Sequence, residues 1–189
     1  VVGQSRRTRL VLLGTGGGPR PRTTSSASAQ VIVSNGIAYV IDCGDGVARQ
    51  MAFAGVPLAS LRHVFITHQH SDHTADYGNL IWLAWTAGLS SRVDTWGPPP
   101  LERMTRLFLE MNQSDIDIRI VNEGRVPLAP LVRVPRHPLA LARFGPDGER
   151  IDAFGQAGRA VHDSGRGEQV AAVLVAPDGK LVVAGTTGS

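Results

Sequence analysis

Apolar residues in this chain fall in short runs that glycine, proline and polar residues separate. Two such runs, residues 30–33 and 37–41, flank Asn35 and Gly36, and this dipeptide is the strongest short signal for a β-hairpin. Stretches with helical spacing alternate with the short runs, which predicts an α/β fold. The expected strands are residues 9–13, 30–33, 37–41, 62–67, 93–96 and 116–121, and the expected helices are residues 47–54, 74–89 and 101–112.

Two of these predictions depend on the period of the apolar positions. Isoleucine at positions 116, 118 and 120 alternates with polar residues, which predicts a half-buried strand. The stripe within residues 74–89, which includes Trp82 and Trp85, has helical spacing, and we interpret it as core rather than as a substrate site. Prolines interrupt the pattern beyond residue 127, and a second hairpin is expected over residues 169–184.

Length and composition indicate one globular domain over residues 1–189, with 42% hydrophobic and 19% charged residues. No apolar run is long enough to cross a bilayer and no signal stretch opens the chain, so no membrane partner is expected. Localisation stays open between cytoplasm and periplasm. The formal net charge of +3 permits an anionic substrate without requiring one. The single cysteine, Cys43, is expected to be buried.

Candidate chemistry gathers in one segment, where His68, His70, Asp72 and His73 follow the apolar run 64–66. If a strand ends just before His68, then His68 and His70 project to the same side. Asp72 and His73 lie where the backbone turns into a helix, so they approach from another direction. Imidazole and carboxylate suit zinc, and manganese or iron less selectively. The spacing therefore predicts a metal site for one or two ions, although Asp72 could also be a simple helix cap.

This His-x-His-x-Asp-His pattern resembles the metal-binding motif of the metallo-β-lactamase superfamily. Residues 12–20, with their glycine-rich turn, and the segment Asp42-Cys43-Gly44-Asp45-Gly46 resemble the branch that contains ribonuclease Z and arylsulfatase-like hydrolases. The similarity extends over about residues 10–100. It implies an αββα sandwich of two mixed sheets flanked by helices, with the second half incomplete in this chain.

The resemblance also implies the ligand set. A third histidine would join His68 and His70 at one metal, and we prefer His162 to its rival His137. Asp72 and His73 would bind a second metal. Asp72 would also be the catalytic residue, orienting or deprotonating the nucleophilic water.

The expected second metal site is poorer than the first. Thr186 stands where the family has a bridging aspartate, and the family's last histidine would follow Ser189. Asp163 and Asp178 match neither position. We therefore expect either a fragment that lacks its C-terminal part or a degenerate member, with the first metal bound more tightly than the second.

The expected function is hydrolysis of a small ester, sulfate ester or phosphodiester by a metal-activated water, with two zinc ions in a complete site. A ribonuclease Z-like endonuclease that processes the 3′ end of tRNA is the alternative. Arg20 and Arg22 could contact phosphate, but Thr23 and Thr24 replace a familiar Arg-Asn pair and no basic arm is visible, so tRNA is not favoured. A metal-binding or partner-binding domain without turnover is a third interpretation. The sequence leaves a homo-oligomer open.

Overall fold

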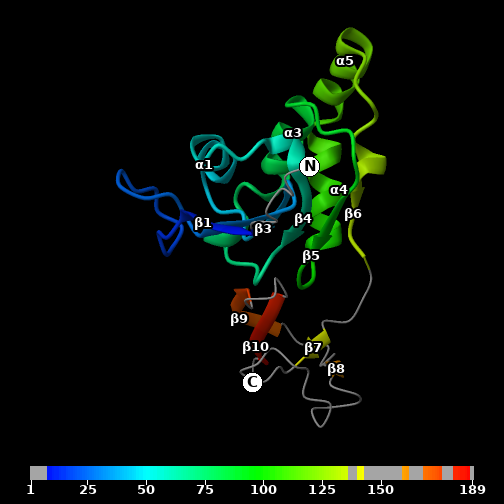
Figure 1. The fold of residues 1–189 in the computed structure, drawn as a ribbon. Helices are drawn as coiled ribbons and strands as arrows, with labels where there is room; N and C mark the ends of the chain where they lie inside the picture. The colour runs from blue at the N-terminus through cyan, green and yellow to red at the C-terminus, as the bar shows by residue number, and fades with distance from the viewer. Residues whose placement is uncertain (1–7, 136–139, 143–158, 162–167, 176–180, 188–189) are drawn as a thin grey trace, which may run out of the picture. The chain divides into compact units, whose positions relative to one another are not determined.

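The computed structural model describes residues 8–135, 140–142, 159–161, 168–175 and 181–187 (Figure 1). The chain divides into two compact units, Val1–Pro135 and Arg136–Ser189. None of the helices in the described part is long and apolar enough to cross a membrane.

A six-stranded mixed sheet forms the centre of the first unit. Its strands follow chain order across the sheet, and the first three pair antiparallel whereas the last three add in parallel. This arrangement, with helices between the parallel strands, confirms the α/β class. The strands are β1 (Arg9–Gly14), β2 (Ala29–Ser34), β3 (Ile37–Ile41), β4 (Leu61–Phe65), β5 (Val93–Trp96) and β6 (Val132–Arg133).

The β2–β3 hairpin confirms the prediction from Asn35 and Gly36. Both residues have positive φ, 52° and 77°, as the favoured two-residue hairpin turn requires. Ser34 pairs with Ile37 directly beside the turn. Strand β4, which precedes the histidine motif, pairs in parallel with β3 and therefore lies in the same sheet, as predicted.

Helices connect the strands of the first unit and cover the sheet. Figure 1 shows α3 beside α4, with which it is in contact. The helices are α1 (Val47–Phe53), α2 (Ser71–Thr74), α3 (Tyr77–Thr86), α4 (Leu101–Met111) and α5 (Gln113–Glu123), and there are short 3-10 turns η1 (Leu58–Ser60) and η2 (Ala129–Leu131).

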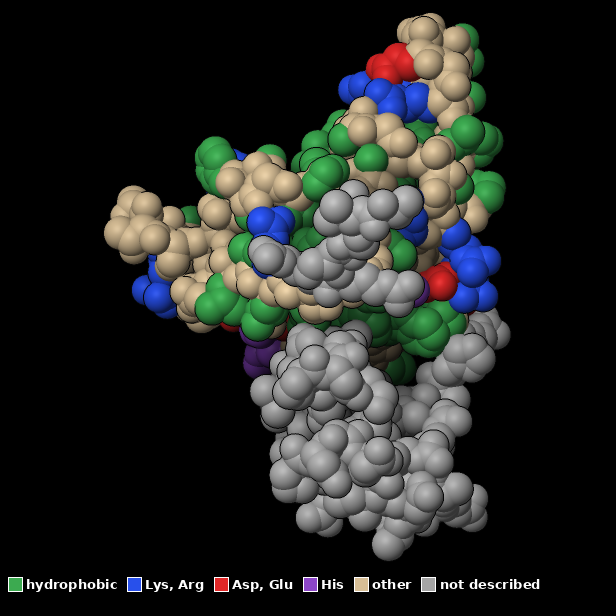
Figure 2. Space-filling model, viewed as in Figure 1, with side chains coloured by type: hydrophobic (Ala, Val, Ile, Leu, Met, Phe, Trp, Pro, Cys, Tyr) green, Lys and Arg blue, Asp and Glu red, His purple; other side chains and the backbone are tan. Residues whose placement is uncertain are grey.

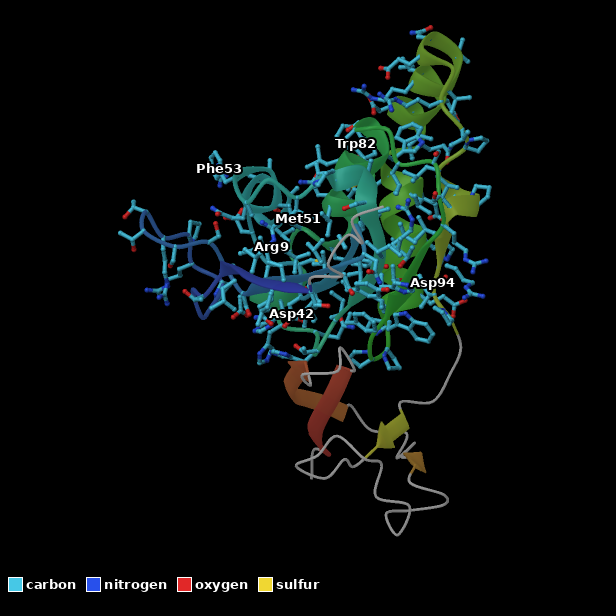
Figure 3. All side chains as sticks on the ribbon, viewed as in Figure 1. Arg9, Asp42, Met51, Phe53, Trp82 and Asp94 are labelled. Atoms are coloured by element: carbon cyan, nitrogen blue, oxygen red, sulfur yellow. The ribbon has the colours of Figure 1, made fainter. Side chains whose placement is uncertain are left out.

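One hydrophobic core joins the sheet to these helices. Trp85 of α3 is 1% exposed, and Trp82 is partly buried against the same core, so the aromatic stripe is core as interpreted. Figure 3 shows Trp82 and, from α1, the buried Met51. The fully buried side chains of the sheet that contact this core include Val31, Val40 and Val64.

The predicted strand over residues 116–121 is wrong, because these residues lie in helix α5. Ile116 is 3% exposed whereas Ile118 is 57% exposed, so the isoleucines do not share one buried face. Arg119 forms ion pairs at 2.8 Å with Asp115 and with Glu123, four residues away in each direction. Such spacing brings side chains together on a helix, so these ion pairs fit the helical backbone.

Only residues 77–86 of the helix predicted over residues 74–89 form one helix, α3, because the chain is interrupted between the end of α2 at Thr74 and the start of α3 at Tyr77. The interruption falls at Asp76, whose Oδ2 accepts a hydrogen bond of 2.7 Å from the backbone N–H of Gly46. The Asp76 N–H donates to the carbonyl oxygen of Cys43 at 2.9 Å. Both partners lie about thirty residues earlier in the chain, so the division depends on tertiary contacts rather than local preference.

The second unit contains two separate two-stranded sheets. Strands β9 (Glu168–Val175) and β10 (Leu181–Thr187) pair antiparallel, which confirms the second predicted hairpin. Strand β7 (Ala140–Ala142) pairs antiparallel with β8 (Arg159–Val161).

Substitution of Gly78 tests the packing of α3 on α4. A Cβ at this position would overlap the ring of Phe108. We expect Gly78→Ala to lower the free energy of unfolding, because overpacking costs about 1–3 kcal/mol and helix propensity returns only about 1 kcal/mol. Gly17→Ala is the control, since no atom lies within 4 Å of the added Cβ. Equal urea midpoints for the two variants would contradict this packing.

Candidate metal-binding site

The histidine motif lies in the segment that leaves the sheet at the end of β4. The strand ends at Phe65, two residues earlier than predicted, and residues 66–70 are irregular before α2 begins at Ser71. The Ile66 N–H still donates to the Trp96 carbonyl at 2.7 Å, so the start of this segment is held to the neighbouring strand. The Gln69 side chain donates to the Pro98 carbonyl at 2.7 Å. These contacts fix the backbone that carries His68 and His70.

Asp42, which is labelled in Figure 3, directly follows β3 and connects both ends of the motif. Its Oδ1 accepts hydrogen bonds from the Thr67 N–H at 2.8 Å and from the Thr67 hydroxyl at 2.9 Å. Its Oδ2 lies 2.7 Å from His73 Nδ1. With Nδ1 of His73 donating to this buried carboxylate, Nε2 is left as the nitrogen that can bind a ligand.

The backbone after Asp42 packs directly against α2. The Cys43 N–H donates to the His73 carbonyl at 2.8 Å. A Cβ on Gly44 would overlap the carbonyl oxygen of Asp72 and the side chain of Ala27, so only glycine permits this approach. Cys43 itself is fully buried, as expected, and burial raises the pKa of its thiol well above the ordinary value.

The three histidines of the motif lie together. His68 Nε2 is 3.1 Å from His70 Nδ1, and the ring centroids of His68 and His73 are 4.0 Å apart. His68 Nδ1 is 3.0 Å from the Thr67 hydroxyl. Figure 2 shows histidine side chains at the surface of the first unit. The two groups of donors that the sequence predicted thus meet at His68.

Asp72 joins this cluster from α2. Its Oδ2 lies 3.6 Å from His73 Nε2 and accepts a hydrogen bond of 2.7 Å from the backbone N–H of Gly18. This backbone hydrogen bond is the main reason that the pKa of Asp72 is lowered from its ordinary value. The same bond places the glycine-rich turn beside the site.

The pKa of His68 is also lowered, first by desolvation and then by the neighbouring His73 and His70 rings, against the opposing effect of the Asp42 and Asp72 carboxylates. A lowered pKa keeps the imidazole neutral, which is the form that binds metal ions. His63, by contrast, stacks on Tyr39 with ring centroids 4.8 Å apart and takes no part in the cluster.

The side chains of this cluster fit a divalent cation in their chemistry. Asp42 holds Nδ1 of His73 and leaves its Nε2 as a possible metal ligand. His68 Nδ1 lies against the Thr67 hydroxyl, and a metal bound at His68 Nε2 would replace the 3.1 Å contact of that atom with His70 Nδ1. Within the part of the chain that the structure describes, no group of three or more histidine, cysteine, aspartate or glutamate side chains is arranged as a formed metal site. The remaining candidates, His162, His137, Asp163 and Asp178, lie outside the described residues. Thr186 belongs to β10, of which the backbone is described.

Sequence reasoning did not identify Asp42 as a site residue. It appeared only within the segment that carries the family resemblance, and its contacts are with residues 25 and 31 positions later. An aspartate directly after a buried strand was the available signal. Tyr77 is a core residue: its hydroxyl contacts Thr95 at 3.0 Å and Thr105 at 2.7 Å, and burial raises the pKa of Tyr77 to about 12.

Comparison with known proteins finds one matching family model and a group of curated relatives that are ribonuclease Z. Residues 8–87 match the family model described as Anti-Pycsar protein Apyc1. Ribonuclease Z from Mycobacterium sp. (strain KMS) is 33% identical over 127 residues, which cover 66% of this chain and 44% of that protein. Ribonuclease Z from Mycobacterium avium (strain 104) is 30% identical over 131 residues, or 68% of this chain and 46% of that protein. The chain thus spans less than half the length of these curated relatives.

Solved structures agree with this result. The short form of human tRNase Z superposes with a TM-score of 0.53 at 27% identity, covering 57% of this chain and 41% of that one. The long-form RNase Z from yeast superposes with a TM-score of 0.54 at 9% identity, covering 80% of this chain and 22% of that one, and it supports the fold alone. The predicted fold class is confirmed.

Replacement of Asp42 by asparagine tests its connecting role. The amide cannot accept at both terminal atoms, so either the Thr67 or the His73 contact is lost in a buried site. We expect Asp42→Asn to lower the free energy of unfolding by about 1–3 kcal/mol. Asp45→Asn, at an exposed position three residues away, should change it by less than about 0.5 kcal/mol. Urea unfolding of both variants measures the difference, and equal effects would show that Asp42 does not hold the motif.

The lowered pKa of His68 predicts an acid dependence. As the pH falls, His68 is protonated in the unfolded chain before it is protonated in the folded chain, because the unfolded imidazole has the ordinary pKa of about 6.5. The contribution of neutral His68 to the free energy of unfolding is therefore complete above the pKa of the unfolded chain. It is lost as the pH falls below that value toward the pKa of the folded chain. NMR titration of the metal-free chain should place the His68 midpoint below 6.5. A midpoint at or above that value would contradict the described environment.

Proposed function

We propose that the chain is a metal-dependent hydrolase that cleaves phosphodiester bonds in RNA. The ground for this proposal is that the chain belongs to the metallo-β-lactamase superfamily and to its ribonuclease Z-like branch. The observation that carries this proposal is the cluster of His68, His70, Asp72 and His73 in the region related to ribonuclease Z. RNA, which the sequence suggested as the alternative substrate, has better support than a small ester or sulfate ester. The 33% identity is with ribonuclease Z.

His68, His70, Asp72 and His73 would hold the metal, with His162 as the candidate third histidine. Zinc is the ion that three imidazoles and a carboxylate favour. A bound divalent ion supplies Lewis acidity and a water of lowered pKa. Sequence similarity supports this assignment, and titration with metal tests it.

The chain's own residues have separable roles in this proposal. Asp42 orients His73 by holding Nδ1 at 2.7 Å, so that Nε2 faces the cluster. Asp72 is the proposed catalytic residue. The hydrogen bond from Gly18 favours its ionised form, as the lowered pKa indicates, so at neutral pH its carboxylate can orient a water molecule, although the lowered pKa makes it a weak proton acceptor.

Substrate comparison with matched variants tests the proposal. The zinc-loaded chain should hydrolyse a precursor tRNA or bis(p-nitrophenyl) phosphate faster than p-nitrophenyl acetate or p-nitrophenyl sulfate. His68→Ala and Asp72→Asn should each lower kcat/KM by about 100-fold or more. His63→Gln is the matched control, since His63 stacks on Tyr39 outside the cluster and should retain activity within a few-fold.

Two results would contradict the proposal. Turnover of the aryl ester or sulfate without any phosphodiester would restore the small-ester interpretation. Zinc bound with no turnover of any substrate would favour a metal-binding domain that has lost catalysis. A chelator should abolish any hydrolysis that depends on the metal, and added zinc should restore it.

A further inference from the structure

Two hydrogen bonds meet at one peptide unit of the glycine-rich turn. The carbonyl oxygen of Gly17 accepts a hydrogen bond from Arg22 Nη2. The N–H of the same peptide unit, which belongs to Gly18, donates to Asp72 Oδ2 at 2.7 Å. This peptide unit therefore lies between a guanidinium group on its oxygen side and a carboxylate on its hydrogen side.

The two charges act on this peptide unit in the same sense. Because the peptide bond is planar, a contact that fixes the direction of the Gly17 oxygen also fixes the direction of the Gly18 N–H. A peptide unit has a dipole of about 3.5 D, with its negative end at the oxygen and its positive end at the N–H. A cation beside the oxygen and an anion beside the hydrogen are both favourable, and hydrogen bonds in such a chain polarise one another. Arg22 thus makes the Gly18 N–H a stronger donor to Asp72.

The orientation of Asp72 depends on this N–H. Among the described residues, no other residue donates a hydrogen bond to its carboxylate. His73 Nε2 lies 3.6 Å from Asp72 Oδ2, which is too long for a hydrogen bond. The direction of the Gly17–Gly18 peptide unit therefore determines where the carboxylate is held.

Arg22 is placed to hold this peptide unit. Its side chain lies along the turn, since a Cβ added to Gly16 would be 3.5 Å from Arg22 Cδ. The Gly16 N–H donates to the Ser26 carbonyl at 2.9 Å, which fixes the start of the turn. Neither Gly17 nor Gly18 has a described atom within 4 Å of an added Cβ. Hydrogen bonds rather than packing therefore orient the peptide unit between them.

The charges around the turn favour an internal role for Arg22. The cavity beside the turn is lined by Arg20 and Arg22 and also by Asp45 and Asp72, so the charges of its lining balance. A lining without excess positive charge does not by itself attract an anion. The contact that the structure shows for the Arg22 guanidinium is with the turn itself.

We propose that Arg22 is a positioning residue for Asp72 and acts on it through the Gly17–Gly18 peptide unit. This inference rests on the proposed function, in which Asp72 is the catalytic carboxylate, and deepens it by assigning a role to Arg22. Glycine on both sides of the peptide bond makes rotation of the unit easy. Without Arg22 the unit can rotate, and the Gly18 N–H no longer directs Asp72.

NMR of the chain in chelator tests this contact without catalysis. The reporter is the Gly18 amide proton, which should move upfield when Asp72→Ala removes its acceptor. Arg22→Ala should move it in the same direction, whereas Arg22→Lys should keep it near the wild-type position because an ammonium group can donate to the same carbonyl. Arg103→Ala, at an exposed position on α4, removes the same charge elsewhere and should leave it unchanged. The Gly36 amide in the β2–β3 turn reports whether each variant is folded.

Kinetics of the zinc-loaded chain with precursor tRNA measure the consequence for catalysis. Arg22→Ala should lower kcat by about tenfold, the loss expected for one charge-assisted hydrogen bond, and should keep KM within about twofold of wild type. Arg22→Lys should recover most of the rate. A raised KM with unchanged kcat would instead identify Arg22 as a substrate contact and would overturn the proposal.

The outcomes separate this inference from the proposed function. A moved Gly18 amide in Arg22→Ala without hydrolysis by wild type would support the contact through the peptide unit and reject the activity. Hydrolysis by wild type, with the Gly18 amide and kcat of Arg22→Ala unchanged, would reject the inference and keep the activity. A moved amide with unchanged kcat would show that Asp72 does not depend on Arg22. A Gly18 amide that does not respond to Asp72→Ala would also overturn the inference, because the connecting hydrogen bond would then be absent in solution.

Discussion

The buried carboxylate of Asp42 is the contact on which the geometry of the candidate site depends. An ionised group that is 3% exposed is costly unless several donors satisfy it. Here the Thr67 backbone N–H, the Thr67 hydroxyl and His73 Nδ1 all converge on its two oxygens. The charge is therefore stable only while both ends of the histidine motif are in place, so the motif and the end of β3 form one structural unit.

The sheet explains how Asp42 reaches both ends of the motif. Strands β3 and β4 are parallel, so their carboxyl ends emerge at the same edge, which places Asp42 beside Thr67. Asp42 has a positive φ of 59°, which turns the chain toward α2. Gly44 then permits the close backbone approach that brings His73 into reach. Any side chain at position 44 would separate the carboxylate from the imidazole that it orients.

Local patterns predicted the parts of this structure that local forces decide. Asn35 and Gly36 specified a hairpin because the turn itself requires positive φ. The alternation of isoleucines from residue 116 predicted the wrong element. These residues form a helix in which Ile116 is buried and Ile118 is exposed, and Arg119 pairs with Asp115 and Glu123 at helical spacing. The division of the predicted helix at Asp76 and the role of Asp42 depend on partners about thirty residues away, which no local pattern contains.

Asp72 shows why the metal-binding motif and the glycine-rich turn belong to one surface. Its carboxylate faces His73 on one side and accepts the Gly18 N–H on the other, so its orientation depends on the turn as well as on α2. The same turn continues into Pro19 and Arg20, and the position of Arg20 is thus related to that of Asp72 through two intervening residues. Changes in that turn should therefore alter catalysis through the Gly18 hydrogen bond that orients Asp72.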